Sequence, residues 1–314
     1  MNVKSKLQDI SRHKKTKELI LAPFRYFFLI AIGYIVLFQL FYMFSYAFRP
    51  SVEMADPSVV WIPRNPTFGR FVEAFESLNY LTTLWNTVSV HIVSALIEVA
   101  TCAIVAYGFA RYNFPFKGVL FGFVIITIMV PQVMISVPLF LNYANFDFLG
   151  ILGGLSKLFG TELRPNLLDS GFVFWIPSIF ASGLRSGLFI FIYRQFFKGL
   201  PYELEEAASI DGAGPIKTFM YIIVPSSGVA ILTVAIFSVV WHWNEYDLSA
   251  LYFNDNYPLS VRLSVVTSEL ATGATNDRGL TMAASLLFVL PVLIMYIILQ
   301  RKFIQSIDRV GIVG

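Results

Sequence analysis

Long apolar runs, each separated from the next by a more polar segment, are the main pattern of the chain. A helix needs about 20 apolar residues to cross the hydrocarbon core of a bilayer, so each run is long enough to be a transmembrane helix. The runs predict six spans, at about 26–48, 84–110, 118–141, 171–193, 222–252 and 280–300. We therefore expect an all-α, multi-pass membrane protein, with a six-span domain over residues 26–303 between an N-terminal segment (1–25) and a tail (304–314).

The composition supports a membrane protein and excludes several other classes. Hydrophobic residues make up 56% of the chain and charged residues 14%, which leaves too few polar groups to cover a soluble domain. These proportions exclude a disordered protein and a nucleic-acid-binding protein, and the net charge of +3 is too small to indicate an acidic partner. The single cysteine, Cys102, lies in an apolar run, so neither a disulfide framework nor a metal site is expected.

Lysine and arginine residues are distributed unevenly among the loops. Most of the 23 fall in segments that are cytoplasmic if the N-terminus is inside the cell. Since cytoplasmic loops carry the excess of positive charge, we expect both termini in the cytoplasm. This orientation places the outer loops at about 49–83, 142–170 and 253–279, and the inner loops at about 111–117 and 194–221.

The inner loop 194–221 contains the clearest local signals. Pro201 suits the first position of a helix, the glutamates that follow suit the positive end of its dipole, and Gly212 suits its end. A second short helix can start at Pro215. One side of the first helix, predicted over 201–211, carries Leu204, Ala207, Ala208 and Asp211. Small alanines there allow another protein to approach closely, although the same caps are also compatible with an ordinary surface linker.

The letters of this loop resemble a known signature. EEAASIDGAG (205–214), followed by IIVPSS (222–227), is similar to the cytoplasmic motif of ABC importer permeases. Segments 85–118, 129–140, 241–253 and 280–303 resemble the carbohydrate-uptake subfamily, and above all the six-span second permease of maltose-type sugar importers. The chain departs from that pattern at Val224, Gly228, Pro215 and Arg185, and in a longer segment at 151–170.

The resemblance implies a fold, a set of partners and a mechanism. It implies a type I ABC importer permease in the bacterial cytoplasmic (inner) membrane, which moves a sugar or oligosaccharide by alternating access. The implied partners are a second homologous permease, two ATPase subunits and an extracytoplasmic solute-binding protein. ATP and Mg²⁺ would bind to the ATPase subunits, so no cofactor is expected on this chain. The residues implied to couple the permease to the ATPase are Glu206, Ala207, Ala208, Asp211 and Gly212.

Polar residues inside the predicted spans fall on single faces. Span two carries such a stripe through Thr87, His91, Ser94, Glu98 and Thr101; span four through Ser178, Ser182 and Arg185; span five through Ser238, His242, Glu245 and Ser249. Because ionisable residues within a membrane usually face a bundle interior or a water-filled path, we expect a hydrated cavity here. The alternative is a set of structural pairs, above all between Glu98 and Arg185.

Sugar recognition requires aromatic rings and hydrogen-bonding side chains together. The stretch from Trp243 to Tyr246 supplies both, and Arg185 hints at an anionic sugar. Our candidates for the substrate path are Glu98, Gln132, Arg185, Trp243, Asn244, Glu245 and Tyr246. Pro131 and Pro138 are expected to bend span three.

Two other functions remain open at this stage. One is an ABC permease for a non-sugar solute, such as a glycerol-phosphate or a peptide. The other is an ion-coupled secondary transporter, although the internal repeats typical of that class are not visible. An enzyme is not indicated, because the only cysteine is intramembrane, the three histidines are scattered and no catalytic spacing occurs.

Overall fold

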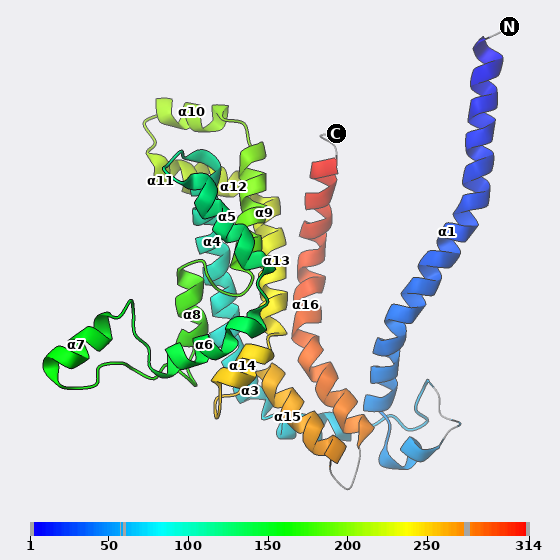
Figure 1. Ribbon diagram of the computed structural model, residues 1–314. Coiled ribbons are helices and arrows are strands. Elements are labelled where there is room, and N and C mark those ends of the chain that lie inside the picture. Colours follow the sequence, from blue (N-terminus) through cyan, green and yellow to red (C-terminus); the bar gives the residue numbers. More distant parts are fainter. Residues whose placement is uncertain (1–2, 57, 59–60, 273–276, 312–314) are drawn as a thin grey trace. The chain divides into compact units, whose positions relative to one another are not determined.

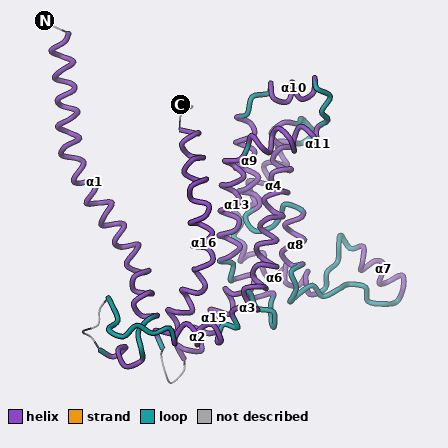
Figure 2. Tube along the Cα trace, turned by 180° about the vertical axis from the view of Figure 1, so that it is seen from behind, coloured by secondary structure: helices purple, strands orange, loops and turns teal. Residues whose placement is uncertain are grey.

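The protein is built from helices and connecting loops. The computed structural model describes residues 3–56, 58, 61–272 and 277–311, and these residues contain no β-strand (Figure 2). The all-α prediction is therefore confirmed. Three described stretches are long and apolar enough to cross a membrane: Leu21–Ala47, Tyr80–Arg111 and Arg278–Gln300. Two bent pairs of helices raise this number to five if each pair counts as one span.

The chain divides into two compact units. The first contains Met1–Ala74 and Gly273–Leu287. It includes α1 (Val3–Ala47), the short helix η1 (Ser51–Ala55) and the start of both α2 (Gly69–Ser77) and α16 (Arg278–Gly311). Most apolar side chains of α1 between residues 21 and 44 are exposed, as expected for a helix that faces lipid.

The second unit contains Phe75–Thr272 and Phe288–Gly314. Its helices are α3 (Tyr80–Thr87), η2 (Val88–Ile92), α4 (Val93–Arg111), α5 (Lys117–Met129), α6 (Gln132–Ala144), α7 (Ile151–Phe159), α8 (Phe172–Ile179), α9 (Ser186–Gly199), α10 (Glu203–Ile210), α11 (Pro215–Thr218), η3 (Phe219–Ile223), α12 (Val224–Ser226), α13 (Gly228–Trp243), α14 (Asp247–Tyr252) and α15 (Leu259–Thr272). Helix α4 is central, because α8, α9 and α13 all pack on it (Figure 1). Helices α10 and α11 lie at one end of this bundle, and α6 and α14 lie toward the other (Figure 1).

Small residues on α4 allow its close packing against α9. Ala103 and Ala106 of α4 belong to the same buried cluster as the aromatic residues Phe189, Tyr193 and Phe197 of α9. In a bilayer, where the lipid is as apolar as the side chains, such small-residue contacts drive helix association through close van der Waals packing.

The structure differs from continuous spans at three places. The predicted third span bends by 101° between Met129 and Gln132, where Pro131 precedes α6. Pro131 therefore bends the chain as predicted, whereas Pro138 lies within α6. The predicted fifth span bends by 81° at residue 227, and the predicted fourth span is interrupted between α8 and α9. The count of six spans remains a prediction, and residues 312–314 of the predicted tail lie outside the described residues.

The start of α9 packs so closely on α5 that it has no room for a side chain at Gly187. A Cβ there would meet the side chain of Thr127 and would lie 2.9 Å from the carbonyl oxygen of Val124. We predict that Gly187→Ala lowers the unfolding free energy by about 1–3 kcal/mol, because a backbone atom cannot yield as a side chain can. Thermal unfolding of the purified protein measures this effect. Gly122→Ala in α5 is the matched control, since nothing lies within 4 Å of its added Cβ. Equal melting temperatures for the two variants would contradict the packing described.

Candidate functional site

A buried carboxylate joins the three central helices. Glu98 of α4 has no exposed surface. One of its oxygens, Oε1, accepts a hydrogen bond from Ser186 Oγ at the start of α9. The other, Oε2, lies 3.0 Å from His242 Nε2 and 3.3 Å from Ser238 Oγ, both on α13. Three helices therefore share one polar centre.

A second histidine extends this centre. His91, in the π-helical turn η2, is fully buried, and its Nε2 lies 3.1 Å from Ser249 Oγ. Its ring centroid is 6.0 Å from that of His242. On the same helix face Thr101 donates to the carbonyl of Ser178 at 2.7 Å. The expectation of a hydrated cavity along the stripe of span two is therefore wrong, because these side chains are packed inside the protein.

The alternative of a Glu98–Arg185 pair is also not what the structure contains. The Glu98 carboxylate instead contacts His242, Ser186 and Ser238. Within the described residues, the guanidinium of Arg185 makes no ion pair, and it lies over the ring of Trp241, 5.7 Å from the ring centroid. Arg185 is exposed, and its backbone is in the left-handed region, with a φ of 64°. Such a conformation is uncommon for a residue other than glycine and clusters at functional sites.

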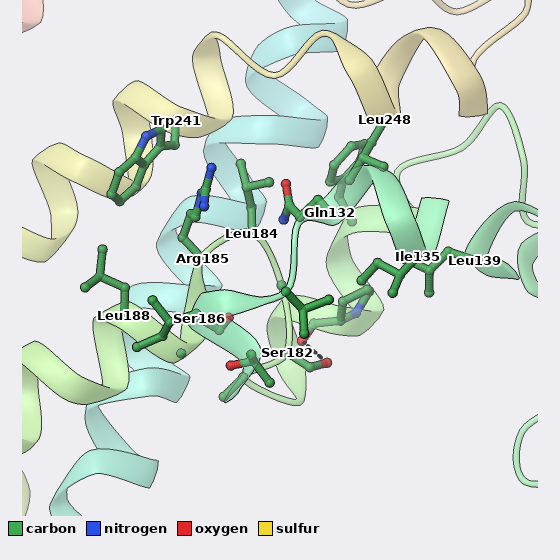
Figure 3. A pocket seen from close by; sticks show the side chains of 18 of the residues that line it. Gln132, Ile135, Leu139, Ser182, Leu184, Arg185, Ser186, Leu188, Trp241 and Leu248 are labelled. Atoms are coloured by element: carbon green, nitrogen blue, oxygen red, sulfur yellow. Dashed lines mark hydrogen bonds between the residues drawn. The ribbon is translucent and has the colours of Figure 1, made fainter. Parts of the chain in front are cut away.

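A cavity of 650 Å³ opens where the third and fourth predicted spans are broken. Most of its surface is apolar, from α5, α6, α8, α9 and α13. Its polar side chains include Arg185, Gln132, Ser182 and Thr127, with Trp241 at one side (Figure 3). The structure thus brings together two of the predicted path residues, Arg185 and Gln132. Glu98 does not line the cavity, but it accepts a hydrogen bond from Ser186, which does.

The predicted stretch from Trp243 to Tyr246 does not line this cavity. Trp243 is buried, and its Nε1 donates to the carbonyl of Phe288 at 3.2 Å. Asn244 donates to the carbonyl of Val240, and Glu245 Oε1 accepts the amide of Leu248 near the start of α14. Tyr246 is exposed.

Trp241 is one of the cavity aromatics that the sequence interpretation missed; the others are Phe123, Tyr143, Phe174 and Tyr252. Two residues apart on a helix, Trp241 and Trp243 point to nearly opposite faces. Trp241 stacks on Phe237, one turn earlier, at 5.5 Å between centroids. The spacing of four residues places both rings on one side of α13, and this is the pattern in the sequence that separates Trp241 from Trp243.

The inner loop contains a short helix, a left-handed glycine and a second helix. Helix α10 begins at Glu203, two residues after the predicted start, with three glutamates in its first turn. Gly212 has a φ of 76°, which favours glycine, and Pro215 is the first residue of α11. The prediction of two helices separated by a glycine turn is confirmed.

Arg111, the last residue of α4, fixes this loop to the bundle. Its side chain is 2% exposed, and its Nε lies 2.7 Å from Glu205 Oε1 as an ion pair. Its Nη2 donates to the carbonyl of Leu200 at 2.8 Å, and its guanidinium lies 4.2 Å from the ring centroid of Tyr202. Glu205 therefore belongs to the attachment of the loop.

Four of the five predicted coupling residues are exposed on this loop: Glu206, Ala207, Asp211 and Gly212. Ala208 is 2% exposed, because α10 turns this residue toward α11 and η3. The expectation that Ala208 contributes to an approachable surface is corrected: its small side chain allows packing within the loop. Any contact of the other four with an ATPase remains a prediction.

The outer segments are organised by carboxylates that accept backbone amides. Asp169 Oδ1 accepts the amides of Asn254, Asp255 and Asn256, which joins the second and third predicted outer loops. Earlier in the 151–170 segment, hydrogen bonds from Arg164 hold the pKa of Glu162 below its ordinary value. No cluster of His, Cys, Asp or Glu within the described residues could hold a metal ion.

Comparison with known proteins defines the class of this fold and site. Residues 100–309 match the family of binding-protein-dependent transport system inner membrane components, and the chain belongs to this family. It is thus a membrane transport subunit, whose family consists of transport components rather than enzymes.

Similar proteins cover nearly the whole chain. The arabinooligosaccharides transport system permease protein AraQ of Halalkalibacterium halodurans is 27% identical over 90% of this chain and 93% of its own length. The trehalose transport system permease protein SugB of Mycobacterium tuberculosis is 23% identical over 91% and 95%. A chain of a bacterial ABC transporter that imports the acidic polysaccharide alginate shares the fold, with a TM-score of 0.72 and 19% identity over 91% of this chain and 98% of that one.

The Glu98 centre predicts a large loss of stability when its carboxylate is removed. We expect Glu98→Ala to lower the unfolding free energy by about 3–5 kcal/mol, because it leaves His242 and two serines buried without their shared partner. Thermal unfolding of the purified protein is the measurement, with the exposed Glu162→Ala as control. Adding His242→Ala to Glu98→Ala is expected to cost much less than the sum of the two single losses. Strict additivity would mean that the two residues do not interact.

Proposed function

We propose that this chain is one of two permease subunits of a bacterial ABC importer that moves a sugar or oligosaccharide across the cytoplasmic membrane. The observation that carries this proposal is the inner loop, in which an exposed acidic helix and a left-handed glycine are anchored to the central helix by Arg111 and Glu205. Membership of a binding-protein-dependent transport family supports the same conclusion. The carbohydrate substrates for which its relatives are named support a sugar as cargo.

The proposed assembly places the termini and the loop 194–221 in the cytoplasm, as the lysine and arginine distribution predicts. Two ATPase subunits, which bind ATP and Mg²⁺, dock from that side, and α10 contacts one of them through Glu206, Ala207, Asp211 and Gly212. A second, homologous permease completes the path, and an extracytoplasmic binding protein delivers the sugar. ATP binding and hydrolysis then alternate the access of the path between the two sides of the membrane.

The energy source provides the first test. In proteoliposomes containing both permeases and both ATPases, we expect uptake of radiolabelled oligosaccharide only when ATP is hydrolysed and the binding protein is present. A proton or sodium gradient without ATP is expected to drive none. Uptake driven by an ion gradient alone would indicate a secondary transporter and overturn the proposal.

The turn of the inner loop provides the second test. Gly212→Asp forces a side chain into a left-handed conformation and adds a carboxylate beside Asp211. We expect it to reduce uptake at least about tenfold and to weaken copurification of the ATPase, while the permease remains in the membrane. Gly214→Ala is the matched control, because Gly214 has a φ of −75° and nothing lies within 4 Å of an added Cβ. Wild-type uptake by Gly212→Asp would refute a coupling role for this turn.

A further inference from the structure

We infer that the 650 Å³ cavity binds an anionic unit of the transported sugar, a carboxylate or a phosphate group, with Arg185 as its counter-ion. This inference rests on the proposed function, since it specifies the substrate class of a sugar importer. The volume is within the roughly 300–1,000 Å³ of typical ligand sites, and the lining is mostly apolar with a few polar groups, as such sites are.

The charge balance of the cavity carries the argument. Among the residues that the structure describes, Arg185 is the only charged one that lines it. Of the two acidic residues close by, Glu98 contacts His242 and two serines, and Glu245 accepts the amide of Leu248. Glu245 interacts with Arg185 through its charge, but the two side chains form no ion pair. A charged side chain within a membrane protein is costly and is usually paired or marks the path of a substrate. Since no described acid lies within ion-pair distance of Arg185, a direct counter-ion is expected from a ligand.

Two helix ends add positive potential at the same place. Helix α6 begins at Gln132 and helix α9 begins at Ser186, and both residues line the cavity. The N-terminus of a helix carries roughly half a positive charge, and broken helices in transporters direct such ends at anionic substrate groups. The breaks in the third and fourth spans therefore supplement the charge of Arg185.

The remaining groups suit a sugar ring. Figure 3 shows Arg185 extending toward Trp241 from the start of α9, and Gln132 entering the pocket from a different element. A flat indole packs against the apolar face of a sugar, and a carboxamide can donate and accept hydrogen bonds to its hydroxyls. A planar guanidinium matches the two oxygens of a carboxylate or a phosphate.

Glu98 acts here as a positioning residue. It accepts a hydrogen bond from Ser186, the neighbour of Arg185, and so fixes the backbone where Arg185 adopts its left-handed conformation. The cation is thereby held at the start of α9 although its own side chain has no acidic partner among the described residues.

The test measures charge preference in the complete transporter with its binding protein. Uptake into proteoliposomes is compared for trimers of galacturonate and glucuronate, for their neutral methyl esters, and for glucose 6-phosphate. We expect the wild type to prefer an anionic probe, and Arg185→Gln to reduce the ratio of anionic to neutral uptake about tenfold or more. Arg185→Lys is expected to retain part of the preference, because it keeps the charge but not the planar fork. Arg164→Gln, in an exposed outer segment, is the control, and copurification of all subunits shows that each variant assembles.

The outcomes separate this inference from the proposed function. An Arg185-dependent preference for the uronates or for the phosphate supports the inference and identifies the anion. ATP-driven uptake of only the neutral sugars, or equal loss of neutral and anionic uptake in Arg185→Gln, overturns the inference and leaves the proposed function intact. The second result would mean that Arg185 pairs with an acid of the partner permease. Absence of ATP-driven uptake of every sugar, with assembly intact, would count against both.

Discussion

Glu98 lies in the second turn of α4 with no exposed surface, and its two oxygens contact side chains from α9 and α13. Taking a carboxylate out of water costs several kcal/mol, and this cost is offset only when hydrogen bonds and an opposite charge reach it with good geometry. Ser186, Ser238 and His242 must therefore stay where they are, and so must the helices that carry them. Because α4 is also the helix on which α8 packs, this one carboxylate fixes the arrangement of the bundle beside the cavity.

Helix breaks then determine what the fixed bundle encloses. The bend between α5 and α6 and the interruption between α8 and α9 leave an opening lined by both breaks. Irregular backbone at membrane depth is tolerated where it is buried in protein or lines a cavity. In this chain the breaks are thus part of the site, and Arg185 and Gln132 reach the cavity because each lies at the start of a new helix.

The sequence predicted local features better than tertiary ones. The two helices and the glycine turn of the inner loop are predictable from sequence, because Gly212 and Pro215 determine their own backbone conformation. Pro131 likewise marked its bend. The polar stripe of span two was located, but whether it faces water or protein depends on α9 and α13, which are remote in sequence. Trp243 was chosen over Trp241 for the same reason, since only packing decides which face of α13 lines the cavity. Ala208 on the loop was assigned to the surface although it packs inward.

The ion pair between Arg111 and Glu205 has a mechanical consequence. Arg111 ends α4, and Glu98 lies 13 residues earlier on the same helix, about 20 Å away along its axis at 1.5 Å per residue. A helix of this length acts as a stiff rod. In the proposed importer, a movement of α10 caused by the ATPase is therefore transmitted along α4 to Glu98. The hydrogen bond from Ser186 to Glu98 then passes the same displacement to the backbone beside Arg185. Substrate binding and the nucleotide state of the ATPase then change together rather than in separate steps. Helix α4 thereby couples ATP hydrolysis to substrate release.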